Sequence, residues 1–65
     1  MWIITVGGTA VNLSKCSCIY FNTYSNFVVA ALEDIAETEY NIKKFDNKDD
    51  AKKYIAELVK KLNEE

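Results

Sequence analysis

The stretch NKDDAKKYIAELVKKLN, residues 47–63, decides the fold of this 65-residue chain. Asn47 is a favourable N-cap residue, and two aspartates stand in the turn that follows, where the helix dipole stabilises acidic side chains. The pattern predicts an amphipathic helix from about Lys48 to Asn63. Its apolar stripe, which would cover one face of a sheet, is formed by Ala51, Tyr54, Ile55, Leu58 and Leu62.

Before the helix, two strand patterns flank a polar turn. Ser17–Asn22 and Phe27–Leu32 are rich in β-branched and aromatic residues, and the segment TYSN between them has the composition of a turn. A register centred on that turn pairs Asn22 with Phe27, and cross-strand partners share a face. One face of this hairpin then holds Ile19, Phe21, Val28, Ala30 and Leu32. The opposite face holds Cys16, Cys18, Tyr20, Phe27, Val29 and Ala31.

The N-terminal segment predicts a second, tighter hairpin. Met1–Val6 and Thr9–Leu13 are strand-like, and Gly7-Gly8 between them suits a two-residue turn, in which both positions need positive φ. In this register the cross-strand pairs are Val6 with Thr9, Ile4 with Val11, and Trp2 with Leu13. One face would carry Trp2, Ile4, Val11 and Leu13. The other face would carry Ile3, Thr5, Ala10 and Asn12.

A fifth strand is predicted from the alternation of polar and apolar residues over Thr38–Lys44. Tyr40 and Ile42 would point inward, and the residues that alternate with them would point outward. Glu33–Glu37 would turn the chain before this strand, and Phe45 would close the core after it.

These elements predict a single α+β domain over residues 1–65, with a β-meander over 1–45 and a capped helix over 46–65. Its antiparallel sheet would have four to five strands, built from two successive hairpins and the fifth strand, with the helix packed on one face. A chain this short buries only about 60% of its unfolded surface, and such domains usually need a disulfide, a metal or a partner chain.

The cysteine and histidine content argues against common kinds of chemistry. The chain has no histidine and two cysteines, Cys16 and Cys18, whose spacing on one strand disfavours a disulfide. Tetrahedral zinc sites use four Cys or His ligands, and Ser-His-Asp catalysis needs His. We therefore expect no metal, no cofactor, no catalytic residue and no enzymatic activity. Unbridged cysteines, and the lack of a signal peptide or a long apolar run, predict a cytoplasmic protein without a membrane span.

Charge is segregated along the chain. Residues 1–32 hold one charged side chain, Lys15, and residues 33–65 hold the other seventeen. The net charge of −2 and the absence of arginine disfavour nucleic acid as a partner, because strong nucleic-acid binders carry a basic surplus and use arginine.

The apolar second face of the predicted sheet is the unusual feature of this sequence. One helix covers one face, and an ordinary antiparallel sheet leaves its other face polar. An apolar patch of several hundred Å² usually marks an interaction surface. Two other interpretations stay open: the sheet curls and buries both faces, or the register is shifted by one residue, which would exchange the faces. The candidate interaction surface consists of Ile3, Cys18, Tyr20, Phe27, Val29 and Ala31.

The leading functional hypothesis is a non-enzymatic protein-interaction module. It would self-associate through this face, as a homodimer, or bind another protein. Burial at about 25 cal/mol per Å² would contribute several kcal/mol before association costs. One alternative is a single-stranded nucleic-acid binder that stacks bases on the sheet aromatics. Another is a small-ligand binder with a pocket between two copies.

Several core and capping segments carry a resemblance to known sequences: Val11-Asn12-Leu13, Ile19-Tyr20-Phe21, Val28-Val29-Ala30, Lys43-Lys44-Phe45, Asp46–Ala51 and Tyr54-Ile55. In these segments, which cover most of the chain, the sequence resembles small uncharacterised proteins from low-GC Gram-positive bacteria and their phages. The resemblance implies a β-meander that runs into a helix after a KKF segment and a capping residue, and it implies no activity.

Overall fold

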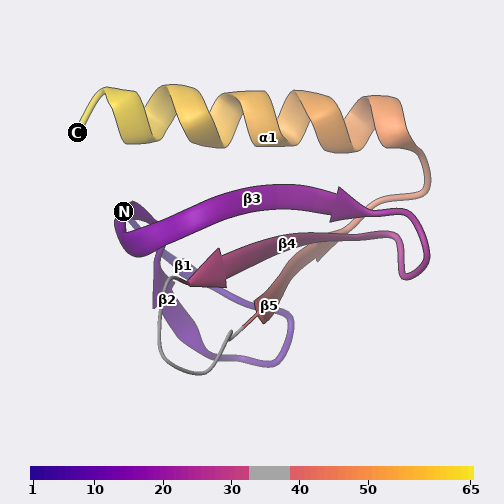
Figure 1. Cartoon of the computed structure of the whole chain (residues 1–65), viewed down its shortest axis with the longest axis horizontal. Helices are drawn as coiled ribbons and strands as arrows, with labels where there is room; N and C mark the ends of the chain where they lie inside the picture. Colours follow the sequence, from indigo (N-terminus) through magenta and orange to yellow (C-terminus); the bar gives the residue numbers. More distant parts are fainter. Residues whose placement is uncertain (33–38) are drawn as a thin grey trace.

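The computed structural model of this chain describes residues 1–32 and 39–65, which form an α+β fold. The helix α1 lies along one side of the strands (Figure 1). Among the described residues, no helix has the length and hydrophobicity needed to cross a membrane. The elements are β1 (Trp2–Ile4), β2 (Ala10–Asn12), the 3-10 helix η1 (Leu13–Lys15), β3 (Cys16–Asn22), β4 (Phe27–Leu32), β5 (Glu39–Lys44) and α1 (Lys48–Asn63).

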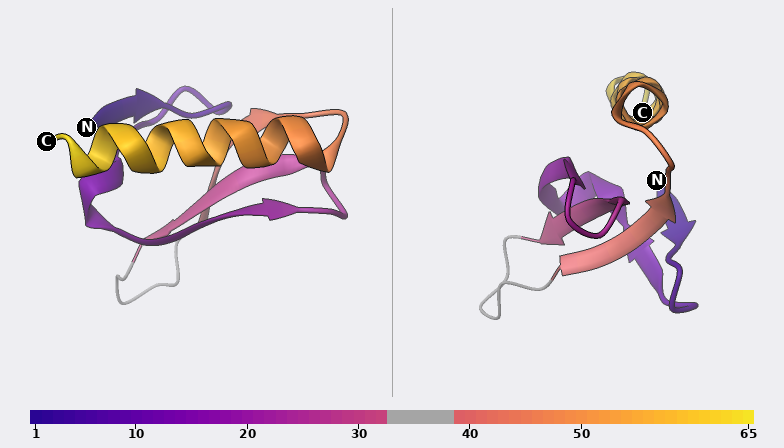
Figure 2. Two further views of the ribbon diagram at one scale, coloured as in Figure 1. Left: turned by 90° about the horizontal axis from the view of Figure 1, so that it is seen from above. Right: turned by 90° about the vertical axis from the view of Figure 1, so that its right-hand side faces the viewer.

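The predicted α+β class is confirmed, whereas the predicted single sheet is divided in two. Strands β3, β4 and β5 form an antiparallel sheet in that order, and β1 pairs with β2 in a separate antiparallel hairpin. A backbone hydrogen bond of 3.0 Å from Val6 N to Asn41 O links this hairpin to β5. The β1–β2 hairpin therefore lies beside β5, as the end view in Figure 2 shows.

The β3–β4 hairpin has the predicted register, because its turn is set by local interactions. Asn22 pairs with Phe27, and the Asn22 side-chain oxygen accepts hydrogen bonds from Tyr24 N at 2.9 Å and Ser25 N at 3.3 Å. Asn26 completes the turn with φ of 64°, a left-handed conformation that asparagine tolerates better than most residues. Each interaction lies within a few residues of the turn, so the pattern of the sequence identifies it.

The core lies between α1 and the adjoining face of the sheet. Asn47 caps the helix, as predicted, by accepting a hydrogen bond of 2.9 Å from Asp50 N. The predicted apolar stripe of the helix faces the predicted inner face of β3 and β4, and both contribute to one hydrophobic cluster. Its buried members are Leu13, Val28, Ala30, Ile42, Ala51 and Leu58.

Strand β5 contains an irregularity that the sequence pattern did not predict. Val28 pairs with Lys43 but Val29 pairs with Asn41, so Ile42 is an extra residue on β5. In such a bulge two adjacent residues oppose one partner, which bends the strand. Ile42 is buried as predicted, and Lys43 places its ammonium over the ring of Tyr54. The predicted turn at 33–37 and the first residue of the predicted strand, 38, lie outside the described residues.

The register of the β1–β2 hairpin differs from the prediction by one residue. Ile3 pairs with Val11, instead of Ile4. Thr5 N donates a hydrogen bond of 2.8 Å to Thr9 O, which leaves a three-residue loop of positions 6–8 in place of the predicted two-residue turn. Gly8 takes φ of 87°, whereas Gly7 has no positive φ. This matches the common three-residue loop, in which one left-handed residue follows a type I turn.

The shifted register changes which residues of β1 face inward. Ile3 packs against the hydrophobic cluster, and its partner Val11 is buried. Trp2 and Ile4, which were predicted to share a face with Val11 and Leu13, point away from the core instead. The prediction was wrong because residues 1–6 are all apolar except Thr5, and such a segment gives no alternation with which to choose a face.

Candidate interaction surface

The predicted interaction surface on β3 and β4 is partly covered within the chain itself. Val29 is 2% exposed, and Tyr20, Phe27 and Ala31 are half-buried, whereas Cys18 is exposed. Ile3 does not join this surface, since it packs against the core. Two of the six predicted residues, Ile3 and Val29, are therefore unavailable to a partner.

A hydrogen bond between the two outer strands explains the burial of Val29. Tyr20 on β3 pairs with Val29, which pairs in turn with Asn41 on β5. The Tyr20 hydroxyl donates a hydrogen bond of 3.0 Å to Glu39 Oε1 on β5. Because β4 lies between these strands, the Tyr20 side chain must cross β4 on the face that holds Val29. The middle of this face, at Val29, is therefore covered within the chain, whereas Cys18 remains exposed.

The Tyr20–Glu39 contact predicts a pH dependence. The hydrogen bond to Glu39, with smaller contributions from burial and nearby charge, raises the pKa of Tyr20 above its ordinary value of 10.0. The neutral phenol is thus favoured in the folded state. The hydrogen bond of the neutral phenol therefore contributes fully to the stability of the fold at a pH below the pKa of Tyr20 in the unfolded state. This contribution is lost as the pH rises through the pKa of Tyr20 in the folded state.

We expect Glu39→Gln to lower the pKa of Tyr20 towards its ordinary value, because the Glu39 carboxylate can only accept a hydrogen bond from the neutral phenol, whereas an amide can also donate one to the phenolate. Absorbance titration of the tyrosines, with Tyr20→Phe subtracted to isolate the Tyr20 transition, measures this shift. Glu57→Gln, on the exposed side of α1, serves as the control and should leave the transition in place. An unchanged transition in Glu39→Gln would show that the two side chains do not interact in solution.

Apart from Tyr24 in the β3–β4 turn, the most exposed large apolar side chains of the described residues lie elsewhere, on β1 and the loop that follows it. Trp2, Ile4 and Val6 are 69%, 66% and 59% exposed. They occupy alternate positions, so Trp2 and Ile4 share the outer face of the hairpin and Val6 continues the series at the start of the loop. We call these three residues the β1 row. Their β2 partners on the same face, Asn12 and Ala10, are an amide and a methyl group.

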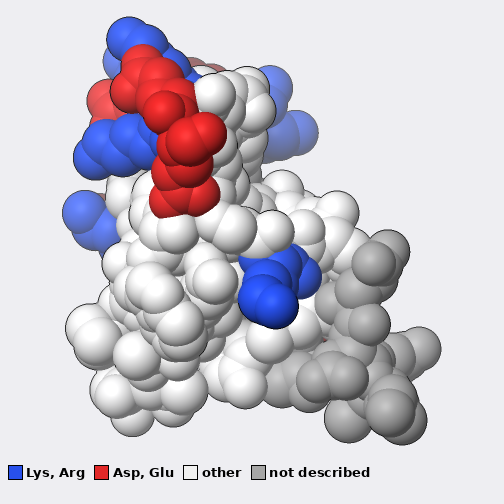
Figure 3. All heavy atoms as spheres, turned by 90° about the vertical axis from the view of Figure 1, so that its left-hand side faces the viewer, with Lys and Arg blue, Asp and Glu red and all other residues white. Residues whose placement is uncertain are grey.

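The surroundings of the β1 row carry little charge. The first charged side chain of the sequence is Lys15, beyond the end of β2. In Figure 3 the acidic and basic side chains gather on the helix, and most of the described surface below it is uncharged. The charge segregation seen along the sequence is therefore also a segregation in space, with the charged helix on one side and the uncharged hairpin on the other.

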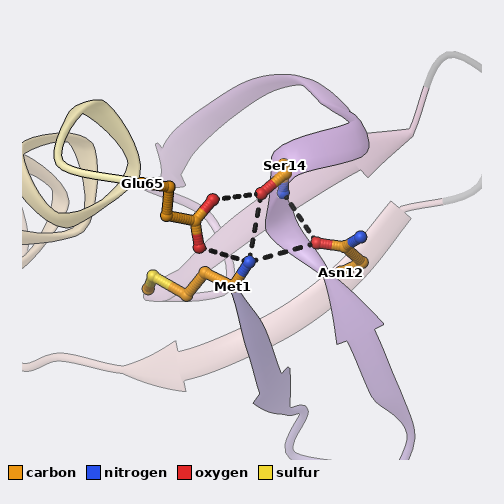
Figure 4. A network of polar contacts seen from close by, with 4 residues as sticks. All are labelled: Met1, Asn12, Ser14 and Glu65. Carbon is orange, nitrogen blue, oxygen red and sulfur yellow. Dashed lines mark hydrogen bonds and ion pairs between the residues drawn. The ribbon is translucent and has the colours of Figure 1, made fainter.

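A polar network holds the beginning of β1 (Figure 4). The Met1 ammonium forms an ion pair with Glu65 and donates hydrogen bonds to Ser14 Oγ at 3.1 Å and Asn12 Oδ1 at 3.3 Å. The Ser14 hydroxyl donates to the second Glu65 oxygen. The hydrogen bonds from the ammonium and from Ser14 lower the pKa of Glu65. The end of α1 is thus joined to the start of β1, a contact between distant segments that the sequence pattern did not predict.

The two cysteines differ in environment. Cys16 was predicted to share a face with Cys18, but Ser17 is an extra residue in the pairing with β4, and Cys16 packs against the core instead. Burial, together with the nearby Cys18, raises the pKa of the Cys16 thiol, which lowers its reactivity. Within residues 1–32 and 39–65, no group of three or more Cys, His, Asp or Glu side chains is arranged to hold a metal ion.

The aromatic side chains are distributed over separate parts of the molecule. Trp2 belongs to the β1 row, Tyr24 is 99% exposed at the tip of the β3–β4 turn, and Tyr20 lies across β4. Phe45 and Tyr54 pack against each other with ring centroids 5.2 Å apart. A single-strand binder uses successive stacking rings beside a basic groove. The spatial arrangement of these rings therefore favours the protein-interaction hypothesis over the nucleic-acid alternative.

Comparison with known proteins adds no further constraint on the function. The candidate site consequently rests on the geometry and exposure of the β1 row. No protein-family model, no curated protein and no solved structure matches this chain.

Proposed function

We propose that this protein is a non-enzymatic protein-interaction module that self-associates through the β1 row. The observation that carries this proposal is the exposure of Trp2, Ile4 and Val6 together, at 69%, 66% and 59%. Contiguous exposed apolar residues of this size usually mark an interaction site in a soluble protein, whereas isolated ones need no explanation.

Both ends of the β1 row are held by the fold, which supports the proposal. At its start, Leu13 N donates a hydrogen bond of 2.8 Å to Met1 O, and the Met1 ammonium pairs with Glu65. At its end, Val6 N donates to Asn41 O at 3.0 Å. A surface that is already ordered loses little conformational entropy on binding, so more of the gain from apolar burial contributes to affinity.

The partner best suited to this surface is a second copy of the chain. In a symmetric contact each residue faces the same surface on the other copy, so any charge would be brought near an identical charge. The hairpin limits this repulsion because residues 1–14 carry no charged side chain and the Met1 ammonium is paired with Glu65. The charged helix would remain in solvent on the outside of the pair, where it opposes further association.

The size of the β1 row sets the expected affinity. Its three side chains expose roughly 400 Å² per copy, about half of what each partner contributes to a standard stable interface. The proposed dimer is therefore a weak one, in rapid exchange with monomer, and its population should rise with protein concentration.

The test is the dissociation constant measured by sedimentation or by light scattering on a sizing column over a wide concentration range. We expect Ile4→Lys to raise this constant by roughly tenfold or more, because a buried isoleucine contributes about 1.5–3 kcal/mol and 1.4 kcal/mol is a factor of ten. Tyr24→Lys adds the same charge at a fully exposed site outside the row, so it should leave the constant unchanged.

Two outcomes would contradict the proposal. The first is that the wild-type chain stays monomeric at every concentration, which would show that it does not self-associate. Equal dissociation constants for Ile4→Lys and the wild type would place the interface on another surface. The helical circular dichroism of each variant verifies that α1 remains folded, so that loss of association is not caused by unfolding.

The proposed location is a reducing compartment such as the cytoplasm. Cys16 and Cys18 are both free thiols, and Cys18 is exposed. In an oxidising compartment an exposed thiol can form disulfides between copies. The association measurements therefore need a reductant, so that they report the non-covalent contact alone.

A further inference from the structure

We infer that two β1 rows pack face to face in antiparallel directions, with Ile4 opposite Ile4 of the second copy and Trp2 opposite Val6. This inference rests on the proposed self-association and names the geometry of the contact. It follows from the symmetry of a pair, the sizes of the three side chains and the position of the charged chain ends.

Facing sheets commonly pack with their strands nearly aligned, and a symmetric contact of this kind has two possible arrangements. Two identical faces that stack on each other are related by a two-fold axis that lies in the plane between them. If the axis runs along β1, the strands are parallel and each residue meets its own copy. If the axis runs across β1 through Ile4, the strands are antiparallel and Trp2 meets Val6. Ile4 is at the centre in both cases.

Side-chain size favours the antiparallel arrangement. Facing sheets pack about 10 Å apart, and well-packed faces alternate large and small side chains so that no void remains. Parallel rows would set two tryptophans against each other at one end and two valines at the other, which forces a gap at the valine end. Antiparallel rows place one tryptophan and one valine at each end and two isoleucines in the middle, so the spacing is even.

Charge favours the same arrangement. The start of β1 lies beside the end of the helix, because the Met1 ammonium pairs with Glu65. Glu64 is exposed at the same end. Parallel rows would bring these charged ends of the two copies together, with each ammonium beside the other ammonium, and like charges side by side oppose association. Antiparallel rows instead place each charged end near the uncharged Gly7-Gly8 loop of the other copy.

The experiment is thiol cross-linking with a short bis-maleimide in a Cys18→Ser background. Cys16 can remain, since it is half-buried against the core and its thiol pKa is raised. The variants are Trp2→Cys, Ile4→Cys and Val6→Cys. Their dissociation constants are measured first, and the reagent is added at concentrations where each variant, or mixture of variants, is dimeric.

We expect Ile4→Cys to cross-link to itself, and a mixture of Trp2→Cys with Val6→Cys to form the mixed dimer. Trp2→Cys alone should not cross-link, because four residues of strand, about 13 Å, separate the two thiols along the antiparallel rows in addition to the gap between the sheets. Efficient self-cross-linking of Trp2→Cys would overturn the antiparallel geometry, as would failure of the mixture to cross-link.

The failure of this inference is distinguishable from the failure of the proposed function. If the wild-type chain is monomeric, the proposed function falls and the geometry with it. If the wild type dimerises and Ile4→Lys weakens the dimer, but Trp2→Cys cross-links to itself, the surface is correct and the antiparallel direction is wrong. If the wild type dimerises and Ile4→Cys does not cross-link, the interface lies elsewhere.

Discussion

Leu58→Ala is expected to lower the free energy of unfolding by about 2–5 kcal/mol, the range measured when a buried leucine is truncated and a cavity remains. Leu58 is 5% exposed and joins α1 to the core cluster. A chain of this length has a total stability of roughly 3–10 kcal/mol. The substitution should therefore remove a large part of the total stability.

Val59→Ala is the matched control for Leu58→Ala, because Val59 is the next residue of the same helix and is 44% exposed. Alanine also has a higher helix propensity than valine, so the free energy of unfolding of this variant should lie within about 0.5 kcal/mol of the wild-type value. Denaturant unfolding followed by circular dichroism measures the free energy of unfolding of both variants. Equal decreases in the free energy of unfolding for the two variants would mean that α1 does not pack against the sheet through Leu58.

Ala51→Leu is expected to destabilise the fold by about 1–3 kcal/mol, because a larger side chain must enter a packed core. Ala51 is 0% exposed and lies in the first turns of α1, where the helix meets the cluster of Val28, Ala30 and Ile42. In a domain of this size each kcal/mol lowers the melting temperature by about 4–8 °C. Thermal unfolding would therefore show a decrease that is readily measured.

The control for Ala51→Leu is Ala56→Leu, which makes the same change on the exposed side of the same helix. Alanine and leucine are both strong helix formers, so the intrinsic cost is small and equal at the two sites. We expect Ala56→Leu to leave the melting temperature nearly unchanged. If Ala51→Leu instead raised the melting temperature, the core would contain unfilled space beside Ala51.

The elements that the sequence predicts correctly are those controlled by local interactions. The bounds of α1 follow from the Asn47 cap and from the spacing of the apolar stripe. The register of β3 and β4 follows from a turn in which the Asn22 side chain accepts hydrogen bonds from Tyr24 N and Ser25 N. Patterns of this kind are complete within a short stretch, so no knowledge of distant contacts is needed to interpret them.

Where the sequence predicts the pairing of strands incorrectly, the observed pairing differs from the predicted one by a single residue. Two adjacent glycines allow either a two-residue turn or a three-residue loop, and the loop that forms uses positive φ only at Gly8. The bulges at Ser17 and Ile42 likewise insert one residue without a compositional signal. The offsets at the glycine loop and at Ser17 move side chains to the opposite face, because the side-chain period of a strand is two residues.

The exposed apolar residues of β1 were predicted incorrectly for the same reason. The prediction placed Ile3 outside and Trp2 and Ile4 inside, and the one-residue shift exchanged them. The alternation of Val11 and Leu13 with Ala10 and Asn12 on the other strand was predicted correctly, but it does not determine which residues of β1 pair with them. Burial of Val29 by the Tyr20–Glu39 bond depends on a contact between residues 19 positions apart, which no local pattern contains.

The separation of charge between the hairpin and the helix makes the folded molecule an amphiphile at the scale of a whole protein. A detergent micelle buries its apolar tails and exposes its polar head groups. A pair of copies joined through the β1 row would likewise bury their apolar hairpins and expose their charged helices. Because pairing consumes the apolar end of each copy, growth would stop at two, whereas a head-to-tail contact would continue into a fibre. Added salt screens exposed charges, so it should change the solubility of such pairs more than their formation.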